Sequence, residues 1–317
     1  MFDDFEPAEA TPLEHAGVSG STLERVRGVD GRVVVVKTEQ PISDWLAKCL
    51  GDDGRLVRLW SAGFFARLPE SIDCAIEAVE RIPTGWRVVM RDVTANLVPA
   101  DRPLSRRSSQ QIMRAIASMH REFAGANLDG LCPLVDRYWF LTPTTVQTIA
   151  THPLGAMVTQ GWARFPEVAP ADVSDAMLAL LEHPAALATV LSRYPATLLH
   201  GDLKMANIGL DGDRVVLLDW GSLTGWGPAA IDHTWYLAVN GAAVDASLDE
   251  LLADMIEVLA PEDRDAVPLA LLGGLLQLGW EKALGATAAD PAVRARESLG
   301  LAWWCRRAAE ALETHHL

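Results

Sequence analysis

The chain has few cysteines and no paired cysteine motif. Its 317 residues include four cysteines that lie far apart, and no two of them form a C-x-x-C arrangement. This spacing indicates neither a zinc site nor a disulfide framework. Scattered cysteines of this kind are typical of buried thiols in a reducing compartment. The four positions are Cys49, Cys74, Cys132 and Cys305.

Positive charge is also scarce. Lysine and arginine together number 27, against 42 aspartates and glutamates, which gives a formal net charge of -15 at pH 7. Nucleic acids and anionic membranes both bind basic patches, so this balance argues against either as a main partner. The composition leaves the oligomeric state open.

A long apolar run is missing as well. The most apolar segment, Pro268 to Trp280, is too short to span a bilayer and is typical of a buried helix. The first ten residues are acidic and lack the basic and apolar pattern of a signal peptide, so we expect a cytoplasmic protein. Since 50% of the residues are hydrophobic, the chain can build a large core, and its length fits two lobes or domains.

The most informative stretch runs from Leu199 to Ile208 and reads Leu-His-Gly-Asp-Leu-Lys-Met-Ala-Asn-Ile. An apolar run at 215–218 follows it and ends in Asp-Trp-Gly at 219–221. Asp211-Gly212 between the two is a strong hairpin signal, so the pattern predicts a loop, a short strand, a tight turn and a second strand. This arrangement brings two carboxylates and one amide together: Asp202, Asn207 and Asp219.

These side chains suit phosphoryl transfer. In that reaction one carboxylate accepts the proton of the attacking hydroxyl, while an amide and a second carboxylate hold the magnesium that bridges the phosphates. Asp202 and Asn207 have the spacing of the kinase catalytic loop, and Asp219 stands where kinases place the aspartate of Asp-Phe-Gly. The alternative is an ordinary loop and hairpin whose polar residues are turn formers.

The motif resembles the aminoglycoside phosphotransferase and choline kinase-like family, the small-molecule branch of the protein-kinase-like fold. The glycine in His200-Gly201-Asp202 favours that branch, because protein kinases usually have arginine there. The resemblance implies an α+β fold of two lobes. The N-lobe, residues 1–92, would be a small antiparallel sheet that binds nucleotide. The C-lobe, residues 93–317, would be mainly helical and would hold the catalytic loop and the acceptor site.

The resemblance also implies an activity and roles. It implies that ATP or GTP, with Mg²⁺, phosphorylates a hydroxyl of a small molecule such as an aminoglycoside, amino sugar or amino alcohol. Asp202 would be the catalytic base, and Lys204 would neutralise the transferring phosphoryl group. Asn207 and Asp219 would bind the metal. A protein kinase is disfavoured, because no Ala-Pro-Glu signature follows Asp219.

The N-terminal third fits the small lobe. A strand is predicted at 22–28, a turn at Asp30-Gly31, and a β-branched strand at 32–38 that carries Lys37. By resemblance Lys37 grips the α- and β-phosphates, and the alternative is a solvated lysine at a strand end. Small residues before these strands allow a backbone to approach phosphates closely. The further nucleotide contacts that the resemblance implies are Gly17, Ser19, Gly20 and Ser21, and Arg91 and Val93 at the hinge.

One expected residue is missing from this region. Helices are predicted at 41–50 and 55–68, and the family usually supplies from the second helix a glutamate that pairs with the strand lysine. The predicted helix contains no glutamate. Glu70, just past its end, and Glu77, in the next strand, are the candidates. The gap keeps open a second hypothesis, a non-catalytic nucleotide-binding module like a pseudokinase.

The remainder is predicted to be helical, at 108–123, 171–191, 247–259, 262–284 and 291–312, with Ser108 or Ser109 as the first cap. His200 would orient the catalytic loop and Asp232 would support it. In this fold C-terminal helices usually border the acceptor site, so their many carboxylates favour a cationic or amino-bearing acceptor. A solvated acidic face is the alternative. These carboxylates are Asp249, Glu250, Asp254, Glu257, Glu262, Asp263 and Asp265.

Overall fold

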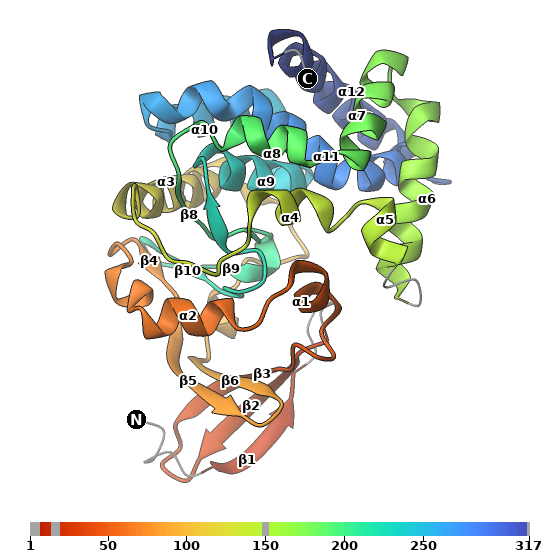
Figure 1. Ribbon diagram of the computed structural model, residues 1–317. Helices are drawn as coiled ribbons and strands as arrows, with labels where there is room; N and C mark the ends of the chain where they lie inside the picture. The colour runs from red at the N-terminus through yellow and green to blue at the C-terminus, as the bar shows by residue number, and fades with distance from the viewer. Residues whose placement is uncertain (1–6, 14–19, 148–151, 316–317) are drawn as a thin grey trace.

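The computed structural model describes residues 7–13, 20–147 and 152–315. An antiparallel sheet lies at one end of the molecule and a mass of helices at the other, with α1 and α2 between them (Figure 1). This is the α+β, two-lobed architecture that the sequence predicts. Within the described residues, no helix is long and apolar enough to cross a membrane.

The small lobe is a five-stranded antiparallel sheet in the order β1-β2-β3-β6-β5. Asp30-Gly31 joins β2 to β3, and Gly31 has a φ of +82°, a conformation that favours glycine. The predicted hairpin is therefore confirmed. The strands are β1 (Pro7–Pro12), β2 (Thr22–Gly28), β3 (Val33–Glu39), β5 (Ile76–Ile82) and β6 (Gly85–Arg91).

Alternation along β3 decides which side chains reach the rest of the molecule. Val34 and Val36 pack with Val26 and Val89 in a small cluster on one face of the sheet. Val35 belongs to the main hydrophobic core instead. Because successive side chains of a strand point to opposite faces, Lys37 and Glu39 share the face of Val35.

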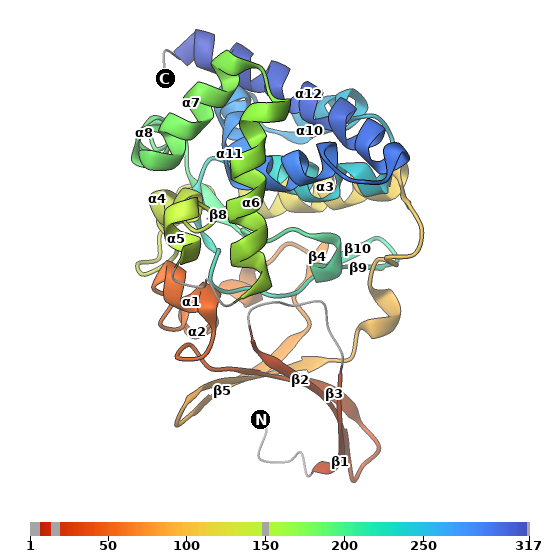
Figure 2. The same ribbon diagram turned by 90° about the vertical axis from the view of Figure 1, so that its right-hand side faces the viewer.

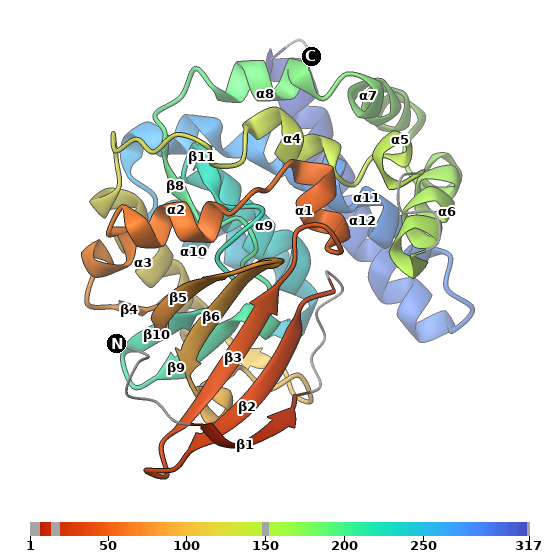
Figure 3. The ribbon, with the colours of Figure 1, turned by 60° about the horizontal axis from the view of Figure 1, so that its bottom comes forward.

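The two helices after β3 are shorter than predicted. Helix α1 (Trp45–Leu50) begins at Trp45 because the Asp44 side chain accepts hydrogen bonds from the backbone N–H groups of Leu46 and Ala47, at 2.8 and 3.0 Å. Helix α2 (Arg55–Ser61) ends well before the predicted residue 68. Gly63 then adopts a left-handed φ of +72°, and a 3₁₀ turn follows at Phe64–Arg67. Figure 3 shows β3 leading directly up to α1.

The helical lobe differs from prediction in several places. Helices α4, α5 and α6 were not predicted, and residues 261–266 form a 3₁₀ turn before α11. Two further differences have a local cause. Helix α3 (Arg106–Glu122) is capped by Ser105, whose Oγ accepts a hydrogen bond from Ser108 N, so the predicted cap was wrong. Ser109 is buried and its hydroxyl lies 3.0 Å from the Tyr236 hydroxyl. The helix predicted at 171–191 is split into α7 (Ala171–Glu182) and α8 (Ala185–Leu191), because Pro184 between them has no N–H to donate.

Helix α11 (Val267–Ala286) lies at the centre of the helical lobe. Nearly all of its side chains are buried, as expected of a helix that is apolar all round. It packs against α6, α9 and α12. The prediction of a buried helix at 268–280 is confirmed. The other helices are α4 (Leu134–Trp139), α5 (Pro143–Val146), α6 (Pro153–Val168), α9 (Ala230–Asn240), α10 (Leu248–Val258) and α12 (Pro291–His315).

A second small sheet lies between the large sheet and the helices (Figure 2). Its order is β4-β10-β9, with β10 (Arg214–Leu217) antiparallel to β9 (Ile208–Asp211) and parallel to β4 (Ile72–Asp73). Gly212 makes the turn with a φ of +58°. The loop, strand, turn and strand predicted from residue 199 onward are thus confirmed. The remaining short strands are β7 (Leu104–Ser105), β8 (Thr197–Leu199), β11 (Gly225–Gly227) and β12 (Val244–Asp245).

Candidate active site

The loop at 200–207 follows β8 and is held by one buried carboxylate. Asp232, on α9, is fully buried and accepts hydrogen bonds from His200 N at 2.7 Å and Gly201 N at 2.9 Å. Its Oδ2 also lies 3.2 Å from His120 Nε2. Burial opposes the charge, but His120, Arg137 and His200 outweigh it and lower the pKa of Asp232 to about 2. Asp232 therefore stays ionised and fixes the backbone at the start of the loop.

His200 connects this loop to the end of β10. Its Nε2 lies 3.0 Å from the carbonyl oxygen of Leu218, and its Nδ1 lies 3.2 Å from the backbone nitrogen of Asp202. Burial lowers the pKa of His200, so the neutral ring is favoured. A neutral ring with its proton on Nε2 donates to Leu218 and accepts from Asp202. The side chain orients the backbone on both sides of the site.

Gly201 allows the loop to lie against the segment that follows Asp219. Its φ is +90°, and a Cβ at this position would stand 2.1 Å from the carbonyl oxygen of Leu223. The Arg137 guanidinium spans the same contact and donates to the carbonyl oxygens of Gly201 and Leu223, at 3.0 and 3.3 Å. Glycine is required here by the close approach as well as by the backbone conformation.

Asp202, Lys204 and Asn207 form a compact group. Lys204 Nζ lies 2.7 Å from Asp202 Oδ2, and the Asn207 amide nitrogen donates to the same oxygen at 3.0 Å and to the Asp202 backbone carbonyl at 2.9 Å. Burial opposes the charge of Lys204, but Asp202 and Asp219 outweigh it and raise its pKa. Within the described part of the chain, no hydrogen bond reaches Oδ1 of Asp202. That oxygen is the one available to accept a proton.

Lys37 lies between two carboxylates. Its Nζ is 2.5 Å from Asp219 Oδ1 and 2.7 Å from Glu39 Oε1. Burial opposes the charge, but these carboxylates raise the pKa of Lys37, and Lys37 in turn holds the pKa of Asp219 well below its usual range. The Lys37 side chain is 14% exposed and that of Asp219 is 37% exposed, so the pair is reachable from outside. Asp219 adopts a left-handed φ of +64°.

Neither Glu70 nor Glu77, the two candidates from the sequence, is the partner of Lys37. Glu77 instead forms an ion pair with Arg32, and Glu70 is exposed on the surface. The partner is Glu39, which the sequence interpretation missed because it looked for a glutamate on the following helix. The signal was available, since residues two apart on a strand lie on the same face.

An apolar pocket of about 340 Å³ opens beside Lys37. Its walls come from β2, β3, the end of β6 and the segment after it, the loop at 200–207 and the residues after β10. They include Val35, Met90, Leu97, Val98 and Leu218. Of the predicted nucleotide contacts, Ser21, Lys37, Arg91 and Val93 line this pocket. Gly20 is exposed and does not line it. Gly17 and Ser19 lie outside the described residues.

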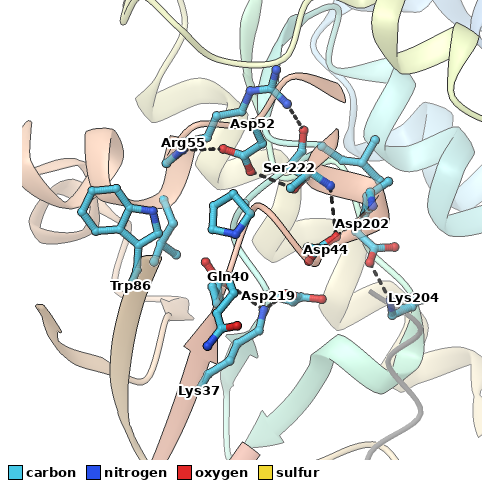
Figure 4. A pocket seen from close by; sticks show the side chains of 18 residues that line it. Lys37, Gln40, Asp44, Asp52, Arg55, Trp86, Asp202, Lys204, Asp219 and Ser222 are labelled. Atoms are coloured by element: carbon cyan, nitrogen blue, oxygen red, sulfur yellow. Dashed lines mark hydrogen bonds and ion pairs between the residues drawn. The ribbon is translucent and has the colours of Figure 1, made fainter. Parts of the chain in front are cut away.

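A second, acidic pocket of about 70 Å³ shares Lys37 with the first, and Figure 4 shows the side chains that line it. It is formed by the end of β3, the start of α1, the loop before α2 and the segment after Asp219. Lys37, Lys204 and Asp219 line both pockets, whereas Asp202 lines only the acidic pocket and Asn207 only the apolar one. The carboxylates in the acidic pocket are Glu39, Asp44, Asp52, Asp202 and Asp219.

The expectation that the C-terminal carboxylates border the site is wrong. In the described part of the chain, none of those seven residues lines either pocket. Arg106 pairs with Glu250 and Asp254, and Arg307 pairs with Asp249. Figure 1 places α10 on the side of the helical lobe away from the sheet. The acidic pocket instead takes Glu39, Asp44 and Asp52 from the N-terminal segment.

The donor atoms at the centre fit magnesium. The Asn207 amide nitrogen donates to Asp202, which leaves its oxygen to face a cation, and Asp219 supplies a carboxylate. Magnesium prefers such oxygen ligands and is usually held by one or two protein groups together with phosphates and water. Among the described residues, no cluster of three or more His, Cys, Asp or Glu side chains could hold a metal alone. The donor set therefore fits a metal that arrives with a phosphate ligand.

The fold and these positions define a class of protein. A small antiparallel sheet with a strand lysine, a helical lobe with an Asp-to-Asn catalytic loop, and an aspartate at the end of a hairpin make a protein-kinase-like phosphotransferase. The family model described as the phosphotransferase enzyme family matches residues 10–267, and the chain belongs to this family. The predicted family and the predicted class of enzyme are confirmed.

Solved structures share this fold at low sequence identity. They include a microcompartment-associated aminopropanol kinase, at 15% identity and a TM-score of 0.59, over 99% of this chain and 96% of that one. The choline kinase LicA from Streptococcus pneumoniae shows 12% identity and a TM-score of 0.53, over 99% and 96%. ADP-bound aminoglycoside phosphotransferase APH(2'')-Ib shows 14% identity and a TM-score of 0.52, over 98% and 96%. No curated protein matches the chain in sequence.

Proposed function

We propose that this protein transfers the terminal phosphoryl group of ATP, with magnesium, to a hydroxyl group of a small molecule. The observation that carries the proposal is the meeting of two unlike pockets at Lys37, Lys204 and Asp219. A nucleotide in the apolar pocket and an acceptor in the acidic pocket would meet at these charged residues. Asp202 then stands on the acceptor side and Asn207 on the nucleotide side.

The roles of the residues follow from this placement. Magnesium, when bound, neutralises charge on the phosphates and aligns them for transfer. Asn207 and Asp219 would hold it, and Lys37 would contact the phosphates. Asp202 would accept the proton of the acceptor hydroxyl through its Oδ1, while Lys204 and Asn207 hold its Oδ2 in place. The apolar walls, with backbone groups near Arg91 and Val93, would enclose the base of the nucleotide.

The acceptor is proposed to carry an amino group. The acidic pocket has five carboxylates, and the cations in its lining, Lys37, Arg55 and Lys204, are all engaged by protein oxygens. With five carboxylates against three cations, the lining carries an excess of negative charge, and such a field concentrates cationic ligands. Two of the structural relatives are named as kinases of alcohols that carry a cationic nitrogen, aminopropanol and choline, which supports a cationic acceptor.

A non-catalytic nucleotide-binding module is the weaker candidate. It rested on the missing helix glutamate, and Glu39 supplies a carboxylate to Lys37 in its place. The base, the metal ligands and the lysine all lie within one connected group. The bound ADP in one structural relative supports ATP as donor, and we propose ATP rather than GTP.

The test is a nucleotide-consumption screen of the purified protein. Amino alcohols, amino sugars, aminoglycosides and their neutral analogues are offered as acceptors, with and without magnesium, and with ATP or GTP as donor. We expect magnesium-dependent ADP release that rises with an amino-bearing acceptor and is lost in Asp202→Asn. Acceptor-dependent turnover that persists in Asp202→Asn would contradict the assignment of the base. A preference for anionic acceptors would contradict the assignment of the acidic pocket.

A further inference from the structure

Ser222 lies three residues after Asp219, and its hydroxyl and its carbonyl oxygen are both bound by side chains of the N-terminal segment. Its hydroxyl donates to Asp52 Oδ2 at 2.7 Å. Its carbonyl oxygen accepts a hydrogen bond from Arg55 Nη1. Asp52 belongs to the short connection between α1 and α2, and Arg55 is the first residue of α2. Figure 4 shows both side chains next to Ser222.

The loop is also held by hydrogen bonds of its own. The second oxygen of Asp52, Oδ1, accepts hydrogen bonds from the backbone N–H groups of Gly54 and Arg55, both at 2.8 Å. Arg55 Nη2 donates to the carbonyl oxygen of Leu50 at the end of α1, at 2.6 Å. Asp52 and Arg55 therefore tie α1, the start of α2 and Ser222 into one unit, which we call the Ser222 clamp.

Stability alone does not account for Arg55. Its side chain is 3% exposed, and its guanidinium binds two backbone carbonyls rather than a carboxylate. Removing a cation from water is costly, and apolar side chains of similar size are often as stabilising in such places. A buried arginine whose hydrogen bonds reach the segment after Asp219 fits a role in fixing that segment.

Asp219 needs such support. A non-glycine residue in the left-handed region is strained and persists only where its surroundings impose the conformation. On its N-terminal side, Leu218 N donates to the carbonyl oxygen of Asn207, and Leu218 O lies next to His200. On its C-terminal side, the Gly221 and Thr224 hydrogen bonds and the Ser222 clamp hold the chain.

We propose that Asp52 and Arg55 are positioning residues, which act through Ser222 to keep the Asp219 carboxylate where it holds magnesium. This inference rests on the proposed function, because it assigns the metal to Asp219. It also makes the N-terminal segment part of the metal site. Among the described residues, Asp52 in the loop before α2 is hydrogen-bonded to Ser222, three residues after Asp219. Glu39 forms an ion pair with Lys37, which also pairs with Asp219.

The test measures magnesium affinity apart from turnover. A thermal-shift titration with a non-hydrolysable ATP analogue gives the magnesium concentration at the midpoint of the added stabilisation. Ser222→Ala removes the hydroxyl contact, Ser222→Thr keeps it, and Arg55→Met removes the guanidinium. Ser192→Ala is the matched control, since this exposed serine hydroxyl donates only to Thr189 O at a helix end.

We expect the magnesium midpoint to rise about three- to tenfold in Ser222→Ala and further in Arg55→Met, as the loss of one or two hydrogen bonds implies. Ser222→Thr and Ser192→Ala should keep the wild-type midpoint, and excess magnesium should restore turnover in Ser222→Ala. A lower melting temperature in Ser222→Ala with an unchanged midpoint would make the clamp merely structural and overturn the inference. A wild-type protein with no magnesium-dependent shift would overturn the proposed function as well, so the two failures are distinguishable.

Discussion

Lys37 and Glu39 lie two residues apart on β3, with Nζ and Oε1 separated by 2.7 Å. The lysine and its carboxylate therefore move together as parts of one strand. In this arrangement the orientation of Lys37 does not depend on a helix docking against the sheet. Helix α2, which could have supplied the carboxylate, is left to contribute Arg55 to the segment beyond Asp219.

Glu39→Gln should weaken, but not abolish, the contribution of Lys37 to phosphate binding. The variant removes one of two carboxylates at Nζ, while Asp219 remains at 2.5 Å. We expect kcat/KM for ATP to fall roughly three- to tenfold, in line with a partly exposed charged hydrogen bond. Steady-state kinetics check this, with Glu77→Gln as the control because Glu77 pairs with Arg32. Equal losses in the two variants would argue that Glu39 has no specific role.

Asp202→Asn should lower kcat by about 10²- to 10⁴-fold, the usual contribution of a general base. Affinity for ATP should change little, because Asp202 lines the acidic pocket and not the apolar one. Turnover assays and a nucleotide titration of the same preparation separate the two effects. A variant that loses nucleotide affinity and keeps kcat would contradict the assignment of Asp202 as the catalytic base.

Gly201→Ala should disrupt the site more than the same change in an ordinary turn. The new Cβ would stand 2.1 Å from Leu223 O, and a backbone carbonyl held by Arg137 cannot easily move away. We expect a loss of about 3 kcal/mol in the free energy of unfolding, together with loss of turnover. Gly212→Ala is the control, since it also has a positive φ but meets no atom within 4 Å. Its cost should be about 1 kcal/mol. Chemical denaturation compares them, and similar losses would refute the steric argument.

His233 should make the protein less stable as the pH falls. It is fully buried, and neither ring nitrogen has a hydrogen-bond partner among the described residues. Burial, and to a lesser degree His120, lowers the pKa of His233 to about 3, from an ordinary value of 6.5. Between these values the unfolded chain binds the proton and the folded chain does not. Stability therefore falls with decreasing pH, by up to about 1.4 kcal/mol per unit.

Denaturation at several pH values between 6.5 and 5 tests this prediction. His233→Leu, which removes this titrating group, should lower the slope of stability against pH. The buried His200, whose pKa is also lowered, should keep part of the slope. The exposed His183, changed to leucine in the same way, should leave the slope as it is in the wild type. A slope as steep in His233→Leu as in the wild type would mean that His233 is not the group that takes up the proton.

The sequence predicted the catalytic loop well because its residues are close together in the chain. The spacing from Asp202 to Asn207 and the hairpin before Asp219 are enough to bring these three side chains together. The acidic pocket was not predictable in this way. Locally, Asp44 caps α1 and Asp52 accepts hydrogen bonds from the turn before α2. They line a pocket with Asp202 only because α1 and its following loop pack against the helical lobe.

The wrong prediction that carboxylates of the C-terminal helices border the acceptor site has the same origin. A run of carboxylates shows where charge is along the chain and not where the helix lies. Arg106 and Arg307, distant in sequence from Asp254 and Asp249, neutralise them away from the site. The helix breaks at Gly63 and Pro184 were visible in the sequence, but the predicted helices ran through both residues.

The pairing of β4 with β10 limits where the chain can be divided into two fragments. Ile72 and Asp73 come from the N-terminal segment, yet they form a parallel ladder with Val215 and Val216, and Val215 N donates to Ser71 O at 2.8 Å. A fragment that started at residue 93 would expose this edge of β10, the strand that leads to Asp219. Two-piece expression should therefore yield a helical fragment that aggregates or stays inactive until the N-terminal piece is added back, as strand complementation across an open edge requires.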